Sequence, residues 1–191
     1  KTKIAYLNKT IDLKTIFWLI PIIDYYRPVN GVIKKQIKLN SNTHEEFNLI
    51  QEKLKKENMV DQFIITHIDN PSGRIKFKDV RKISIGVSKK DLLSYRCKKK
   101  SAFYNCFVLI LRLKIADTFK EFHVKVFNTG KLEIPGIQSH SHIKPIVDIL
   151  ITHLRLSMPS VSYIETSEEV VLINSNFNCG YFINRENLFK R

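Results

Sequence analysis

The residues in this sequence that could do chemistry together are its lysines and arginines, whose natural partner is phosphate. The chain carries a formal charge of +14, and the stretch between Ser72 and Ser101 supplies +9 of it, with only Asp79 and Asp91 opposing eleven basic residues. Such a cluster neutralises several phosphates and gives binding that weakens steeply with salt. The cluster does not distinguish DNA from RNA or from an acidic protein, and the alternative is a solvated face in a chain rich in Lys, Asn and Ile. The eleven are Arg74, Lys76, Lys78, Arg81, Lys82, Lys89, Lys90, Arg96, Lys98, Lys99 and Lys100.

A row of amides follows near the end of the sequence. Asn174, Asn176 and Asn178 are spaced by two, so on a strand their side chains would share one face. Amides on one face can donate to purine N3 and pyrimidine O2 in a DNA minor groove. An exposed edge strand, or simple enrichment in Asn, would give the same row.

Three aromatic residues offer a second kind of contact. Phe127 comes directly before the turn Asn128-Thr129-Gly130, and Phe103 and Phe107 lie near the start of an earlier strand. An aromatic residue at a strand end is usually part of the core. It can also be an exposed wedge that unstacks a base step.

Other classes of function find little support. His140 and His142 have no third ligand nearby, Cys97, Cys106 and Cys179 form no CxxC pair, and no nucleotide or hydrolase motif is present. We therefore expect no enzyme, catalytic residue, metal, cofactor or small-molecule substrate. The apolar stretch from Thr15 to Ile23 is interrupted by Pro21 and is too short to span a membrane. With 43% hydrophobic residues, the chain is expected to fold.

The first half of the sequence alternates strands and helices. A helix is expected from Asp12 to Ile20, where Pro21 ends it, and a second from Thr43 to about Lys56, where Thr43 and Glu46 form a capping box. The turn Asn70-Pro71-Ser72-Gly73 separates two further strands. The predicted strands are Lys3–Leu7, Val32–Leu39, Gln62–Ile68, Arg74–Lys78 and Lys82–Val87.

The second half is more regular. Phe119 to Phe127 alternates between two faces, with Phe122, Val124 and Val126 on one of them, and Lys131–Ile134 returns as its hairpin partner. The remaining predicted elements are a strand over Phe103–Leu113, a helix over His142–Leu156, strand residues from Val161 to Asn178 and a helix from about Ile183. This order suggests a tandem repeat whose second copy is cut short. Because the chain begins at Lys1 rather than Met, we expect a fragment of a longer protein.

These residues bear a resemblance to a known family. Phe127–Gly136 resembles the Phe-x-Ser-Gly-Lys-x-x-x-Thr-Gly signature of TATA-box-binding proteins, and Ile11–Ile16 is similar to their first-helix entry, Leu-Asp-Leu-Lys-Thr-Ile. Tyr25–Pro28 is similar to their Tyr-Asn-Pro, and Phe103–Leu113 to their long second strand. The basic run and the Lys/Asn/Ile bias look most like the divergent members from large nucleo-cytoplasmic DNA viruses.

The resemblance implies an α+β fold: a curved antiparallel sheet, or saddle, with helices on its convex face, and a tandem repeat whose second copy is incomplete. Residues 1–158 would form the first repeat, with a long basic insertion at about 28–101, and residues 159–191 would begin the second. Family members bend AT-rich DNA by inserting phenylalanines through the minor groove. Phe127 matches one such position. The other falls near Cys106, which leaves Phe107 and Phe103 as candidates.

Two departures from the family concern the groove. Pro135 replaces a Thr, which removes a hydroxyl, and the second repeat's base-contacting Asn aligns near Leu172, so that Asn174 is the nearest substitute. The residues expected to contact DNA are Phe127, Phe107, Phe103, Asn174, Asn176, Lys125, Lys131, Lys98, Lys99 and Lys100.

The sequence thus predicts a viral TATA-binding-like transcription factor. It would bind and bend AT-rich double-stranded promoter DNA and recruit a transcription-factor-IIB-like protein and the viral RNA polymerase. We expect it in the host nucleus or a cytoplasmic viral factory, or packaged in the virion, and not at a membrane. Two alternatives stay open: a protein-interaction module with the same fold, and a general binder of single-stranded nucleic acid that stacks bases on Phe103, Tyr104 and Phe107.

Overall fold

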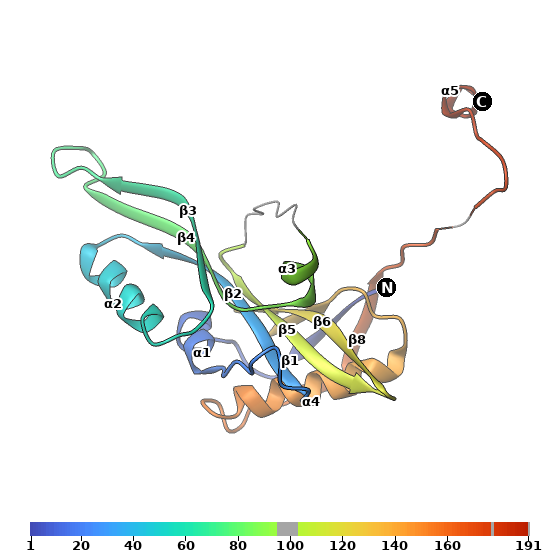
Figure 1. The fold of residues 1–191 in the computed structure, drawn as a ribbon, viewed down its shortest axis with the longest axis horizontal. Helices are drawn as coiled ribbons and strands as arrows, with labels where there is room; N and C mark the ends of the chain where they lie inside the picture. The colour runs from blue at the N-terminus through green and yellow to red at the C-terminus, as the bar shows by residue number, and fades with distance from the viewer. Residues whose placement is uncertain (95–102, 177, 191) are drawn as a thin grey trace.

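The chain folds around a single antiparallel sheet with helices packed on it (Figure 1). The computed structural model describes residues 1–94, 103–176 and 178–190. Within them, no helix is long and apolar enough to cross a membrane. The elements in chain order are β1 (Thr2–Leu7), α1 (Leu13–Leu19), β2 (Gly31–Ser41), α2 (His44–Leu54), β3 (Val60–Asp69), β4 (Phe77–Gly86), α3 (Lys89–Leu93), β5 (Cys106–Ile115), β6 (Thr118–Phe127), β7 (Lys131–Ile134), α4 (Ile143–Leu154), β8 (Tyr163–Leu172) and α5 (Arg185–Phe189).

The eight strands lie in the order β3-β4-β2-β5-β6-β7-β1-β8, and every neighbouring pair is antiparallel. The predicted α+β class with an antiparallel sheet is therefore confirmed. The segment predicted as an insertion, about 28–101, contributes three strands, β2, β4 and β3, which extend this same sheet from β5 to its edge. At the other edge, β8 pairs with β1, whose chain position is more than 150 residues earlier.

One face of the sheet holds the core. Alternate side chains of β5 and β6, among them Phe107, Leu109 and Val124, have no exposed surface and pack in one cluster with Phe17 of α1 and Ile146 of α4. The side-chain period of two puts the intervening residues on the opposite face. A one-residue slip would expose the whole set, so burial fixes the register of these strands. The predicted alternation of Phe119–Phe127 is confirmed.

The first helix is capped at its N-terminus by Asp12 and held to the sheet at its C-terminal end. Asp12 accepts hydrogen bonds from the amides of Lys14 and Thr15, and the Thr15 hydroxyl at 2.6 Å lowers the pKa of this carboxyl. At the other end, buried Lys35 of β2 donates to the Ile20 carbonyl at 2.9 Å. Its second partner is Glu57 at 3.0 Å, so one ammonium joins α1, β2 and the segment after α2.

Several predicted boundaries differ from the structure. Arg74–Lys78 and Lys82–Val87 were expected as two strands, but Phe77–Gly86 is one strand, because Asp79 and Arg81 pair with each other instead of breaking it. The last strand ends at Leu172 and not at Asn178. The helix α3 was not predicted at all, although Ser88 and Asp91 form a capping box at its N-terminus.

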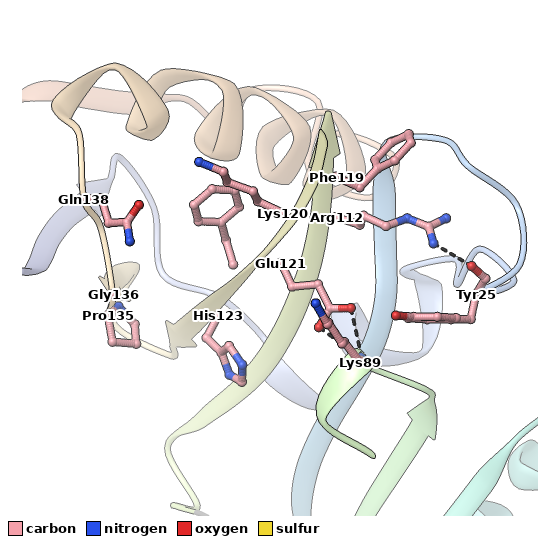
Figure 2. A pocket seen from close by; sticks show the side chains of 11 residues that line it. Tyr25, Lys89, Arg112, Phe119, Lys120, Glu121, His123, Pro135, Gly136 and Gln138 are labelled. Carbon is pink, nitrogen blue, oxygen red and sulfur yellow. Dashed lines mark hydrogen bonds between the residues drawn. The ribbon is translucent and has the colours of Figure 1, made fainter. Parts of the chain in front are cut away.

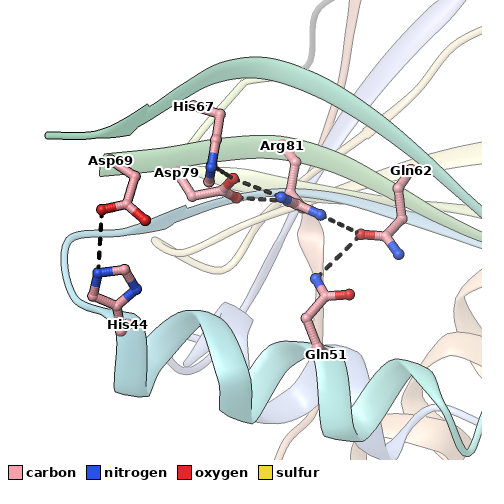
Figure 3. Close-up of polar contacts among 7 residues, drawn as sticks. All are labelled: His44, Gln51, Gln62, His67, Asp69, Asp79 and Arg81. Carbon is pink, nitrogen blue, oxygen red and sulfur yellow. Dashed lines mark hydrogen bonds and ion pairs between the residues drawn. The ribbon is translucent and has the colours of Figure 1, made fainter. Parts of the chain in front are cut away.

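Asp79 and Arg81 are the centre of a polar network between α2 and the β3–β4 hairpin (Figure 3). Arg81 donates to both oxygens of Asp79 at 2.6 Å, and His67 lies 2.8 Å from the same carboxylate. Gln62 accepts from Arg81 at 2.7 Å and from Gln51 of α2 at 3.3 Å. Burial opposes the charge on Asp79, but the bonds from Arg81 and His67 outweigh it and lower the pKa of the carboxyl.

We predict that Asp79→Ala destabilises the protein by about 3 kcal/mol, because it leaves the Arg81 guanidinium buried without its carboxylate. Since the pKa of Asp79 is lower in the folded state, its contribution is present above about pH 4 and is lost as the pH falls through the folded value. Denaturant unfolding at pH 7 and pH 3 measures both effects. Asp69→Asn, in an exposed pair with His44, is the control and should cost under ~1 kcal/mol. Equal losses in the two variants would contradict the prediction.

Candidate nucleic-acid interface

The face of the sheet that points away from α1, α2 and α4 is called the distal face here. The strand register assigns its members, since each lies directly opposite another on the neighbouring strand: Gln36 opposite Val108, Val108 opposite Lys125, Lys125 opposite Glu133. This face carries many more polar side chains than the core face. Its members on the central strands include Lys34, Gln36, Lys38, Asn40, Cys106, Val108, Ile110, Arg112, Phe119, Glu121, His123, Lys125, Phe127, Lys131 and Glu133.

Four of the predicted contact residues come together at one end of β5, β6 and β7. Phe127 lies opposite Cys106 and is partly exposed, and the Lys131 ammonium lies 5.9 Å from its ring centre. Lys125, two residues earlier on the same face, pairs with Glu133 at 2.6 Å and lies 5.9 Å from the ring of Phe103. Each lysine therefore stands beside an aromatic ring at the distal face.

The predicted roles of the two earlier aromatics now separate. Phe103 is 65% exposed, as a base-contacting residue must be. Phe107 has no exposed surface and packs on Phe17 of α1 with ring centres 6.4 Å apart. The prediction of Phe107 as a DNA contact or a stacking platform is therefore wrong. Its side chain points into the core because it lies two residues before the buried Leu109 and therefore on the same face of β5.

The amide row and the lysine run have different outcomes. Asn174 and Asn176 are exposed, but they follow the end of β8 and belong to no strand, so the strand geometry expected for them is wrong. Within the described residues, no hydrogen bond joins Asn174 or Asn176 to the distal face at Phe127. Lys98, Lys99 and Lys100 lie outside the described residues.

The short helix α3 lies on the middle of the distal face (Figure 1). Lys34 of β2 donates to Asp91 at 2.7 Å, and both oxygens of Glu121 on β6 accept from the Lys89 amide, at 2.9 and 3.2 Å. Burial opposes the charge on Asp91, but the bonds from Lys34 and Ser88 outweigh it and lower the pKa of this carboxyl. Ile110 beneath is only 3% exposed, so the centre of the distal face is covered and its accessible parts lie on both sides of α3, toward β6, β7 and β1 and toward β4.

A cavity of about 700 Å³ opens beside α3 (Figure 2). Two of its polar groups are engaged within the protein: Arg112 donates to the carbonyls of Tyr25, Arg27 and Val29, and Glu121 accepts from the Lys89 amide. These bonds join residues 25–29 to β5 and α3 to β6, so the cavity lies where these segments of the protein meet. The residues that line it are Tyr25, Lys89, Arg112, Phe119, Lys120, Glu121, Phe122, His123, Pro135, Gly136 and Gln138.

Thiols and metal ligands add no further site in the part of the chain that is described. No group of three His, Cys, Asp or Glu side chains there could hold a metal ion. Cys106 is buried, which raises the pKa of its thiol, and Cys179 is exposed. Comparisons with protein-family models, curated proteins and solved structures found no match for this chain.

We predict that Asp91→Ala loosens α3, because this carboxylate accepts from Lys34, from the Ser88 hydroxyl and from the Ser88 amide. Loss of a capping interaction costs ~1 kcal/mol, so amide hydrogen exchange over residues 88–93 should become roughly fivefold faster. Asp117→Ala, in the exposed turn between β5 and β6, is the matched control and should leave this exchange unchanged. Unchanged exchange in Asp91→Ala would show that the helix is held by something else.

Proposed function

We propose that this protein is a TATA-binding-like factor that holds the minor groove of AT-rich duplex DNA against its distal face. The observation that carries the proposal is the end of β5, β6 and β7, where Phe127 and Phe103 each stand beside a lysine. The opposite face of the same strands is sealed by α1 and α4. Because α1 and α4 cover the core face, the distal face with its paired lysines and aromatic rings is the side that could contact a duplex.

The arrangement of strands supports the saddle interpretation. Five neighbouring strands of the sheet lie in the order β2-β5-β6-β7-β1. Along the chain, α1 follows the first of them, β1, and α4 follows the last, β7. The next strand, β8, lies antiparallel to β1 and is followed by α5, so strand and helix recur in the same order. Two repeats related by a twofold rotation would place their first strands side by side in this way.

The charges suit a phosphate backbone. Lys131 has no ion pair among the described residues, whereas Lys125 is partly neutralised by Glu133. Tyr6, directly opposite Lys131 on β1, is 37% exposed and extends the surface toward β8. In a chain of +14, lysine contacts to phosphate would position the duplex without reading its sequence.

Sequence preference would then come from the deformability of the DNA. Phe127 at the end of β6 would enter a base step and unstack it, and the TA steps of AT-rich DNA are among the most easily kinked and unstacked. Phe103 is the second exposed aromatic at this end. The part of the face beneath α3 can meet DNA only if α3 moves, so the proposed contact is centred on β6, β7 and β1.

The proposed role in transcription uses the other face. With DNA on the distal face, the outward surfaces of α1 and α4 would be free for a transcription-factor-IIB-like protein and the viral RNA polymerase. The chain would act in the compartment where the viral promoters are transcribed.

A second candidate, binding of single-stranded nucleic acid, is favoured by one observation. Phe103 and Tyr104 are 65% and 57% exposed, and the ammonium of Lys38 lies 3.7 Å from the Tyr104 ring centre. Exposed rings beside lysines can stack bases of a single strand. The burial of Phe107 removes the third platform expected for this function.

We predict that Phe127→Ala abolishes bending of AT-rich duplex and lowers affinity roughly tenfold, within the range of 1–3 kcal/mol for an aromatic contact to a base. Fluorescence energy transfer between labels on the two DNA ends reports the bend, with GC-rich duplex and a single strand as comparison ligands. Phe119→Ala is the matched control, because Phe119 lies on the same face of β6 at its other end.

The outcomes separate the two candidates. A bend on AT-rich duplex that Phe127→Ala removes and Phe119→Ala keeps supports the minor-groove wedge. Duplex binding without a bend, or an identical effect of both variants, contradicts it. Equal affinity for duplex and single strand, lost in Phe103→Ala, would favour the stacking function.

A further inference from the structure

The hairpin of β3 and β4 reaches beyond the rest of the sheet. Pairing of β2 with β4 stops at Ser41 opposite Asp79, whereas β3 and β4 remain paired as far as Asp69 opposite Phe77. The turn of residues 70–76 extends further still, and the hairpin projects from the body in Figure 1. We call residues 66–79 the ribbon.

The tip of the ribbon is a rigid and strongly basic turn. Between Asn70 and Lys78 the chain has three basic residues and no acidic one, namely Arg74, Lys76 and Lys78. None of the three forms an ion pair with any described residue. The turn is closed by the Asn70 amide, which donates to the Lys76 carbonyl at 2.8 Å.

The two faces of the ribbon carry different kinds of charge. The face toward α2 holds Asp79, paired with Arg81 and His67, so its charges are matched inside the protein. The other face continues the distal face, with Lys78 and Lys82 four residues apart on β4. Lys38 of β2 lies directly opposite Lys82.

We propose that the ribbon is a second DNA-contacting element, which binds phosphates of the same duplex beyond the segment held at Phe127. The proposal rests on the proposed function of the distal face. A hairpin that packs on α2 carries Arg74, Lys76 and Lys78 within five residues, and a duplex offers one charge per about 1.7 Å along its axis. Contacts of this kind lengthen the binding site and fix its direction without reading bases.

The test compares two triple variants of equal charge change on two AT-rich duplexes of about 12 and about 24 base pairs. Neutralising three phosphate contacts should reduce the slope of log affinity against log salt by about 2.7. The ribbon variant is Arg74→Gln, Lys76→Gln and Lys78→Gln. The control carries exposed substitutions on the side of the helices, in α1 and directly after α2, namely Lys14→Gln, Lys55→Gln and Lys56→Gln.

On the long duplex only, we expect the ribbon variant to bind at least tenfold more weakly and to show a salt slope reduced by about 2.7. Its hydroxyl-radical footprint on the long duplex should shorten at one end, whereas the control variant should keep both the slope and the footprint. A second variant, with only Arg74→Gln and Lys76→Gln in the turn, should show a smaller loss in the same direction. Thermal unfolding checks that all variants fold.

Three results would overturn the proposal: equal losses in the ribbon and control variants, equal losses on both duplex lengths, or an unchanged footprint. The wedge is reported separately by the bend. A bend that persists while the ribbon variant behaves as wild type overturns only the ribbon. A slope and footprint that depend on the ribbon, without any bend, overturn only the wedge, and a wild type that binds no duplex overturns both.

Discussion

The rest of the structure depends on the burial of one face of β5 and β6 beneath α1 and α4. Phe107, Leu109 and Val124 have no exposed surface, and moving either strand by one residue would exchange them for side chains such as Lys125. That constraint sets the register, and the register decides which residues reach the distal face. The placement of Phe127 there is thus a consequence of core packing several residues away.

The two faces of the sheet also differ in their charged groups. On the side of the helices, charged groups that lie in the interior have partners inside the protein, as Lys35 has in Glu57 and Asp79 has in Arg81. On the distal face, Lys38 lies opposite Lys82, and Lys125 and Lys131 stand beside aromatic rings. Two distal lysines are also paired within the protein, Lys34 with Asp91 and Lys125 with Glu133, whereas Lys131 forms no ion pair among the described residues and is suited to an external polyanion.

Sequence alone predicted the elements whose pattern is unambiguous and missed those that depend on partners. The strict alternation of Phe119–Phe127 and the Thr43 cap gave β6 and α2 correctly. Phe107 was misplaced because the strand from Cys106 to Leu111 is apolar on both faces, so only its pairing with β6 shows which side is buried. The β4 strand was divided in two because Asp79 and Arg81 are polar, and their mutual pairing under α2 is a tertiary contact. Ser88 and Asp91 were the available signal for α3.

The central claim is that DNA meets the distal face and not the helices. The most direct measurement is the chemical reactivity of individual lysines toward acetylation, with and without an AT-rich duplex, read by mass spectrometry. We expect Lys125 and Lys131 to lose reactivity when the duplex is bound, while Lys14 on α1 and Lys144 on α4 keep theirs. Protection of Lys14 and Lys144 with unchanged reactivity at Lys125 and Lys131 would contradict it.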